Sequence, residues 1–204
     1  MGENLDFYIE QDVYQLIESV RADLGVEKKH VVTCGSSKGG YAAIYFEGKY
    51  NYGASIAGAP QILLGDYLGI KEHQGIFRFI AGNYDEANRE YLNNLLLQAV
   101  LAKKSANHIS IHVSDQEGMY ADHVKPFLSF TEQHDITLFL QLGTYTKHSL
   151  VGHISQALRF RRFRISLKNN TGSQYVRVLV FSCFMPLRKF RNIIRNHNLL
   201  SLTG

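Results

Sequence analysis

The chain has 204 residues, of which 45% are hydrophobic and 20% are charged, with 17 glycines and only 3 prolines. A chain of this length buries roughly two thirds of the surface that its unfolded form exposes, and the composition excludes a disordered protein, a collagen-like repeat and a disulfide scaffold. The net charge of +4 is unevenly distributed, because residues 136–204 hold 11 Lys or Arg and no acid, whereas residues 1–135 carry a net charge of −7. The basic end is predicted to face either an anionic polymer or the acidic part of the same molecule.

The first predicted element is a helix over residues 11–24, where apolar residues fall three and four positions apart before Gly25. Four short segments are predicted as strands, at 30–34, 52–57, 108–113 and 136–142, and the β-branched first of them is predicted to be buried. The helical segments between them are predicted at 41–46, at two or three places within 61–103, and at 119–133. Parallel neighbouring strands need crossover connections of this length. The sequence therefore predicts an α/β fold with a mostly parallel sheet and crossover helices.

The end of the chain follows a different pattern. A predicted helix around residues 149–160 precedes two alternating segments, 163–168 and 175–181, which flank a turn-rich stretch as the strands of a β-hairpin would. We expect residues 1–162 to form the α/β domain and residues 163–204 to form a basic β-hairpin and helical tail.

Cysteine usage and hydropathy indicate the compartment. Cys34 and Cys183 are the only cysteines, so neither a disulfide framework nor a four-cysteine zinc site is available. The chain lacks a run of about 18 apolar residues, and its first ten residues carry three acids instead of a basic start. We therefore expect a cytoplasmic protein with no membrane span.

One segment combines a strand, a glycine-rich turn and a helix: residues 30–46, with the turn Gly35-Ser36-Ser37-Lys38-Gly39-Gly40. This is Gly-x-Ser-x-Gly, in which the serine adopts a strained conformation that exposes its Oγ and the glycines stand where a Cβ would collide. Ser37 is the predicted nucleophile, and the backbone N–H of Lys38 is the predicted oxyanion donor. A Walker loop and a dinucleotide fingerprint both require a different order of residues. The remaining alternative is a glycine-rich connection without chemistry.

A serine nucleophile needs a base and a carboxylate at later strand ends. Asp115 follows the predicted strand 108–113 and His148 follows the predicted strand 136–142, which places both at one edge of a parallel sheet. The chain order Ser37, Asp115, His148 is that of the α/β-hydrolase triad.

Two assignments stay open. Glu117 is an alternative acid, because a strand-end aspartate such as Asp115 is also common as a turn residue. His153 is an alternative base to His148, although its position predicts that it lies within a helix. No metal and no cofactor is expected, because no carboxylate spacing completes a site with the other histidines of the α/β part, including His108, His112 and His123.

Residues 11–160 resemble the C-terminal two thirds of an α/β-hydrolase catalytic domain. The stretch from Val32 to Ala43 is similar to a bacterial branch that works on surface glycans, including capsule-biosynthesis proteins and the acyltransferase-like component of accessory secretion systems. The resemblance implies that Ser37, Asp115 and His148 carry the triad.

The chain departs from that family at its start. Only 29 residues precede the nucleophile strand, whereas a hydrolase sheet has several earlier strands, one of them followed by the loop that donates the second oxyanion N–H. We therefore expect an N-terminally truncated fold that is a fragment, that is completed by a partner chain, or that survives without catalysis. Loss of one oxyanion donor costs about 10²- to 10³-fold in turnover.

The leading hypothesis is a serine-dependent acyl ester hydrolase or acyltransferase that acts on a surface glycan or its precursor. Hydrolysis and transfer share the serine, the histidine and the oxyanion donor, so the sequence leaves both open. The alternative is a non-catalytic hydrolase-fold module that binds an anionic polymer or a partner protein. Cations and aromatics also alternate from Arg159 to Arg164, but no nucleic-acid-binding motif accompanies them.

Overall fold

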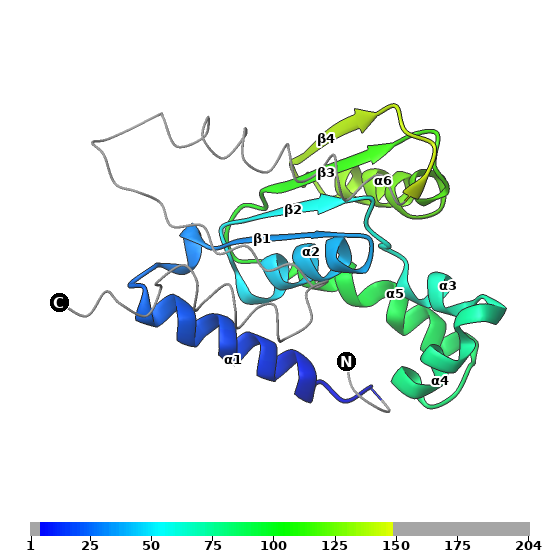
Figure 1. The fold of residues 1–204 in the computed structure, drawn as a ribbon, viewed down its shortest axis with the longest axis horizontal. Coiled ribbons are helices and arrows are strands. Elements are labelled where there is room, and N and C mark those ends of the chain that lie inside the picture. The colour runs from blue at the N-terminus through cyan, green and yellow to red at the C-terminus, as the bar shows by residue number, and fades with distance from the viewer. Residues whose placement is uncertain (1–4, 149–204) are drawn as a thin grey trace.

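A computed structural model describes residues 5–148 of the chain. All four strands are parallel and form one sheet in the order β1-β2-β3-β4 (Figure 1). The strands are β1 (Val32–Ser36), β2 (Ala54–Gly58), β3 (Ile109–Ser114) and β4 (Leu138–Gly143). The α-helices are α1 (Tyr8–Asp23), α2 (Lys38–Tyr50), α3 (Leu64–Gly69), α4 (Gln74–Ala81), α5 (Glu86–Leu101) and α6 (Lys125–Gln133). The shorter turns are the 3₁₀ helices η2 (Lys28–His30) and η3 (Lys71–His73) and the π-helical turn η4 (Tyr120–Val124).

The predicted α/β class, with a parallel sheet and helical crossovers, is confirmed. The helix predicted around 149–160, the hairpin and the basic part at 163–204 lie outside the described residues. Within residues 5–148, no helix is long and apolar enough to cross a membrane.

The strand register brings the carboxyl ends of the strands to one edge of the sheet. Ser36 at the end of β1 lies opposite Gly58 at the end of β2. Ser114 at the end of β3 lies opposite Gly143 at the end of β4. The loops that follow all four strands therefore meet at this edge, where open α/β sheets build their sites.

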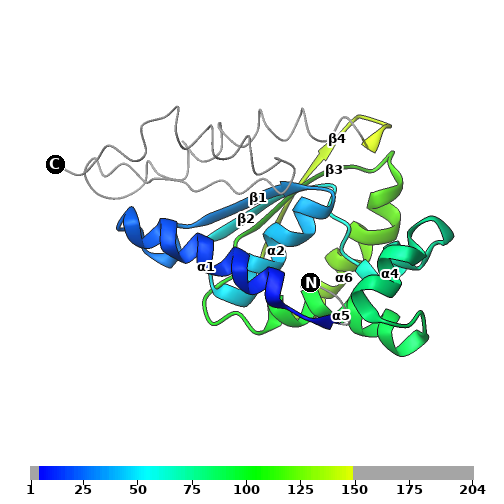
Figure 2. The ribbon, with the colours of Figure 1, turned by 60° about the horizontal axis from the view of Figure 1, so that its bottom comes forward.

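The helices α1, α2 and α5 lie on one side of the sheet (Figure 2). Between this layer and the strands lies a buried cluster that includes Ile44 of α2, Leu96 of α5 and Ile111 of β3, each at most 1% exposed. A second cluster around Phe77 and Leu92 joins α3 and α4 to α5. Because α5 contributes to both clusters, it connects the sheet to the α3–α4 region.

Helix α1 differs from the predicted apolar stripe. Ile17 is buried, but Val13 and Leu16 are exposed. The inward face instead carries Glu10, whose carboxylate accepts hydrogen bonds from Tyr45 Oη at 2.8 Å and Tyr50 Oη at 2.5 Å. Polar contacts to α2 therefore help to orient α1. The periodicity of apolar residues alone does not predict these contacts.

A buried ion pair joins α2 to the segment after α5. The side chains of Glu47 and Lys103 contact each other, and both are 0% exposed. Glu47 Oε1 also accepts a hydrogen bond from the backbone N–H of His108 at 3.2 Å, just before β3. The pair thus ties the helix after β1 to the entrance of β3.

Candidate active site

Ser37 occupies the turn between β1 and α2. Its backbone has φ 56° and ψ −122°. Residues other than glycine adopt this conformation only when the surrounding structure holds them in it. Its N–H donates to the carbonyl of Gly58 at 2.8 Å, and its carbonyl accepts from the N–H groups of Gly40 and Tyr41 at 3.0 and 3.2 Å. These bonds fix the strained turn to both β2 and α2.

The turn requires glycine at position 35 and leaves little space for a side chain at position 40. A Cβ added to Gly35 would lie 2.0 Å from the carbonyl oxygen of Gly39, and a Cβ added to Gly40 would lie 3.1 Å from the Cβ of Pro60. Backbone therefore approaches backbone at the end of β1 more closely than any side chain would permit. This close approach matches the strand–turn–helix setting that the motif predicts for Ser37.

Lys38 is the first residue of α2, and its side chain is exposed. The first N–H groups of a helix point out of its N-terminus, where the helix dipole favours negative charge. The backbone N–H of Lys38 thus lies at the end of α2 that adjoins Ser37.

His148 pairs with Glu117, the alternative acid. His148 Nδ1 lies 2.9 Å from Glu117 Oε2, and Glu117 is 5% exposed. Asp115 is exposed. The loops that carry this pair follow β4 and β3, so both side chains come from the same edge of the sheet as Ser37.

The turn after β3 explains which carboxylate faces inward. The carbonyl of Ser114 accepts from the N–H of Glu117 at 3.3 Å, and Ser114 Oγ accepts from the N–H of Gln116 at 3.2 Å. The turn brings residue 117 back over the strand end while Asp115 lies at its exposed corner. Although Asp115 and Glu117 are only two residues apart, the first is therefore exposed to solvent and the second is buried.

The arrangement leaves one histidine nitrogen available for proton transfer. A carboxylate on Nδ1 favours the tautomer in which Nδ1–H donates and Nε2 accepts. His148 Nε2 is buried and has no hydrogen-bond partner among the described residues. The competing base His153 lies outside the described residues.

Two buried aromatic groups lie close to this pair. The rings of His112 and Tyr145 lie 5.6 Å apart, and each residue is 6% exposed. Burial lowers the pKa of His112, and burial together with the charge of Glu117 raises the pKa of Tyr145 to about 12. Both side chains are therefore neutral near pH 7, so they add no charge beside the Glu117–His148 pair.

The other two histidines of the α/β part considered as metal ligands, His108 and His123, differ in their surroundings. His108 is exposed, whereas His123 is buried and its Nδ1 accepts a hydrogen bond from the N–H of Leu63 at 3.1 Å. Residues 5–148 contain no group of three or more His, Cys, Asp or Glu side chains that could hold a metal ion.

A cavity of about 230 Å³, here called the cap pocket, lies between the first turn of α2 and the α3–α4 region. Its polar and aromatic wall is formed by Lys38, Tyr41, Gln61, Tyr67 and His73. Its apolar wall is formed by Leu64, Leu68, Ile76 and Ile80. Sequence reasoning identified only helical segments here, because pocket-lining residues at irregular spacing carry no motif.

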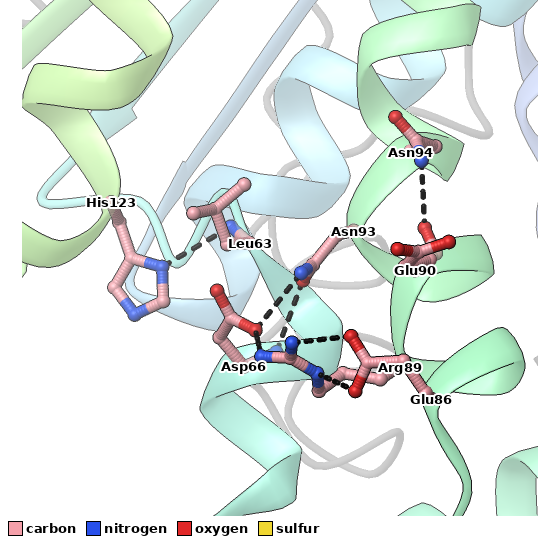
Figure 3. A network of polar contacts seen from close by, with 8 residues as sticks. All are labelled: Leu63, Asp66, Glu86, Arg89, Glu90, Asn93, Asn94 and His123. Carbon is pink, nitrogen blue, oxygen red and sulfur yellow. Dashed lines mark hydrogen bonds and ion pairs between the residues drawn. The ribbon is translucent and has the colours of Figure 1, made fainter.

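Polar contacts anchor the wall of the cap pocket to α5 (Figure 3). Asp66 of α3 pairs with Arg89 at 2.7 Å and accepts from Asn93 Nδ2 at 2.9 Å. The amide of Asn93 also accepts from the backbone N–H of Asp66 at 3.0 Å, and Arg89 pairs in turn with Glu86. Together with the His123–Leu63 bond, these contacts hold α3 in a fixed position beside the sheet edge.

Two buried histidines make stability depend on pH. Burial lowers the pKa of His112 and His123 below the ordinary value of 6.5. The unfolded chain therefore binds more protons than the native chain below that pH, so stability is fully present above about pH 6.5 and falls as the pH drops. We expect urea unfolding between pH 7.5 and 5.5 to show a loss of up to about 1.4 kcal/mol per pH unit and per histidine.

The variant His123→Asn keeps an acceptor for the Leu63 N–H but cannot titrate, so it should remove the contribution of His123 to this dependence and leave that of His112. The matched control His108→Asn, at an exposed position, should leave it unchanged. A free energy of unfolding that rises toward acid pH would contradict this assignment.

Comparison with protein-family models and with curated proteins gives no match. Comparison with solved structures gives clear likenesses. The Glycosylation Associate Protein (Gap123) complex from Streptococcus agalactiae superposes with a TM-score of 0.61 at 20% identity, over 80% of this chain and 33% of the matched chain. The capsule O-acetyltransferase of Neisseria meningitidis serogroup A superposes with a TM-score of 0.61 at 23% identity, over 72% and 62% of the two chains.

A third likeness is to FphF of Staphylococcus aureus, a fluorophosphonate-binding serine hydrolase, with a TM-score of 0.58 at 16% identity over 74% and 62% of the two chains. The chain thus spans a third to somewhat under two thirds of the length of these structures. The parallel sheet, the strained serine between β1 and α2, and these superpositions agree. This chain therefore has the α/β-hydrolase fold that these structures share.

Proposed function

We propose that the chain catalyses serine-dependent acyl transfer from an ester, either to water or to an acceptor hydroxyl. One observation carries the proposal: the strained Ser37 and the pair formed by His148 with the buried Glu117 lie in loops at the same edge of one parallel sheet. A serine held above a sheet edge, with a carboxylate-oriented histidine on other loops of that edge, is the arrangement that acyl transfer uses.

In this proposal each residue of the site takes one role. Ser37 Oγ attacks the ester carbonyl while His148 Nε2 takes its proton, and the same nitrogen later protonates the leaving alcohol. Glu117 holds Nδ1–H and stabilises the imidazolium. The backbone N–H of Lys38 donates to the oxyanion that develops on the carbonyl oxygen. Water or an acceptor hydroxyl then releases the acyl group from Ser37 by the reverse sequence of proton transfers.

We further propose a surface glycan or its precursor as the ester substrate or acceptor. The support is the likeness to a capsule O-acetyltransferase and to a glycosylation-associated complex, which share the fold with this chain. The second of these is an assembly, which supports a protein partner for this chain as well. Among the described residues β1 pairs only with β2, so its other edge is the place where such a partner, or further chain, would supply a second oxyanion donor.

The test is labelling with a fluorophosphonate probe, which reacts covalently only with an activated serine. We expect one adduct per chain, mapped to Ser37 by peptide mass spectrometry. Ser37→Ala should abolish labelling, while Ser36→Ala, the neighbouring serine at the end of β1, serves as the matched control and should retain it. Absence of labelling in the folded wild-type chain, or an adduct on another serine, would refute the proposal.

A pair of substitutions distinguishes the catalytic contributions of Asp115 and Glu117, the two carboxylates that follow β3. We expect Glu117→Gln to reduce turnover of an aryl ester by about 10⁴-fold, because loss of the carboxylate removes the charge that orients and stabilises the histidine. Asp115→Asn should leave turnover close to wild type, because that side chain is exposed. The measurement is kcat/KM for both variants at constant pH, and the opposite ranking would return the acid to Asp115.

A further inference from the structure

The wall of the cap pocket contains two residues that each carry a buried polar atom without a hydrogen-bond partner in the part of the chain that the structure describes. Gln61 is 3% exposed, and its Oε1 has no hydrogen-bond partner among the described residues. The hydroxyl oxygen of Tyr41 is likewise buried without a partner. Buried polar side chains in proteins are hydrogen-bonded in the large majority of cases. Ten buried side-chain atoms of residues 5–148 lack a partner, and only these two belong to residues that line the cap pocket, where a bound group would complete them.

Both residues are connected to the Ser37 turn. The N–H of Tyr41 donates to the carbonyl of Ser37 at 3.2 Å. Gln61 lies in the loop after Gly58, whose carbonyl accepts the N–H of Ser37 at 2.8 Å. Lys38, the residue after the serine, is itself part of the wall. A group of the substrate that enters the cap pocket therefore lies next to the reacting carbonyl.

The rest of the wall limits what that group can be. The volume of the cap pocket, about 230 Å³, is below the roughly 300–1,000 Å³ that is typical of sites for drug-sized ligands. The pocket therefore admits one small group. No carboxylate lines it, and four of its nine lining residues are aliphatic. Burial raises the pKa of Tyr41 above its ordinary value, so its hydroxyl remains a neutral donor and acceptor.

We propose, building on the acyl transfer proposed above, that Gln61 and Tyr41 are specificity-determining residues that select a small neutral group bearing a hydroxyl. The hydroxyl donates to Gln61 Oε1 and accepts from Tyr41 Oη, while its carbon skeleton contacts Leu64, Leu68, Ile76 and Ile80. A site built around such hydrogen bonds discriminates against the analogue that lacks the hydroxyl, because the buried groups are then left unpaired.

The hydroxyl can belong to the acyl group or to the alcohol of the ester, and two matched pairs of esters distinguish these sources. The acyl pair is 4-nitrophenyl 3-hydroxybutanoate against 4-nitrophenyl butanoate. The alcohol pair is glycerol 1-acetate against propyl acetate. We expect kcat/KM to favour the hydroxylated member of one pair by about tenfold to a hundredfold, and the pair that shows the preference identifies the source.

Substitutions that keep shape and remove the polar atoms test the residues. Tyr41→Phe and Gln61→Met should each lower kcat/KM for the hydroxylated ester far more than for its plain analogue, which brings the ratio toward one. Tyr8→Phe and Gln98→Leu are the matched controls, because both side chains are exposed and lie outside the pocket. If Gln61→Met does not fold, as judged by thermal unfolding, Tyr41→Phe carries the test.

A binding measurement separates this proposal from the acyl-transfer proposal. Saturation-transfer NMR on the Ser37→Ala chain needs no turnover, and glycerol 1-acetate or 3-hydroxybutanoate should bind more tightly than its plain analogue. Loss of that difference in Ser37→Ala/Tyr41→Phe would support the assignment. Equal binding and equal turnover of the members of both pairs, or a preference that the two variants leave unchanged, would overturn it even if Ser37 is labelled by fluorophosphonate.

Discussion

Replacing Ser37 with alanine is expected to lower ester turnover by about 10⁵- to 10⁶-fold while the free energy of unfolding changes little. The hydroxyl oxygen that the substitution removes is the attacking atom of the proposed reaction, so no other group of the site can replace it. The side chain is half-buried in a turn, and alanine leaves the backbone hydrogen bonds to Gly58, Gly40 and Tyr41 in place. The measurements are kcat with an aryl acetate and urea unfolding of the same preparation.

His148→Ala should have a similar effect, and the double variant Ser37→Ala/His148→Ala should be no worse than either single variant, because residues that act as one unit are not additive. Ser36→Ala provides the matched control and should retain turnover. Turnover that persists in Ser37→Ala would disprove the nucleophile assignment. Loss of turnover in His153→Ala together with an active His148→Ala chain would show that only the base is misassigned.

Removing one partner of the Glu47–Lys103 pair is expected to cost about 3–5 kcal/mol of stability. Both side chains are fully buried, so Lys103→Met leaves an uncompensated carboxylate in the interior. Burial already raises the pKa of the Glu47 carboxyl above its ordinary value, which the hydrogen bond from Lys103 opposes. The measurement is the free energy of unfolding from urea titration at pH 7.

Two further variants make this prediction specific. Lys104→Met changes the neighbouring, exposed lysine and should have little effect on unfolding. The double variant Glu47→Leu/Lys103→Met removes both charges and should recover a large part of the loss, although the N–H of His108 then lacks its acceptor on Glu47. A single variant that unfolds like wild type would show that the pair is not buried in solution.

The distribution of strands and the position of Ser37 are predictable from the sequence because local chemistry determines both. Short β-branched segments separated by helical stretches allow only a parallel sheet with crossovers. At position 35 only glycine fits, because a Cβ there would lie 2.0 Å from the carbonyl oxygen of Gly39. Few other local sequence patterns require a glycine at this place relative to a serine. Residue types alone therefore identify the turn that carries the candidate nucleophile.

The partner of His148 depends on tertiary structure. Asp115 and Glu117 lie two residues apart in one loop, and either side chain is chemically suitable. Only the turn that begins at Ser114 directs residue 117 inward and residue 115 to solvent. Sequence periodicity does not extend through a turn, because each backbone conformation there is set by its own hydrogen bonds.

Residue chemistry by itself determined the α/β class, the order of the strands along the chain and the position of Ser37 in the turn after the first strand. Tertiary structure decided the inward face of α1, the carboxylate beside the histidine and the existence of the cap pocket. Each of these features brings together side chains that are distant in the chain: Glu10 contacts Tyr45, Glu117 contacts His148, and Tyr41 and Ile80 line one cavity. Such contacts follow from the packing of elements against each other, whereas propensity and spacing describe only what happens within one element.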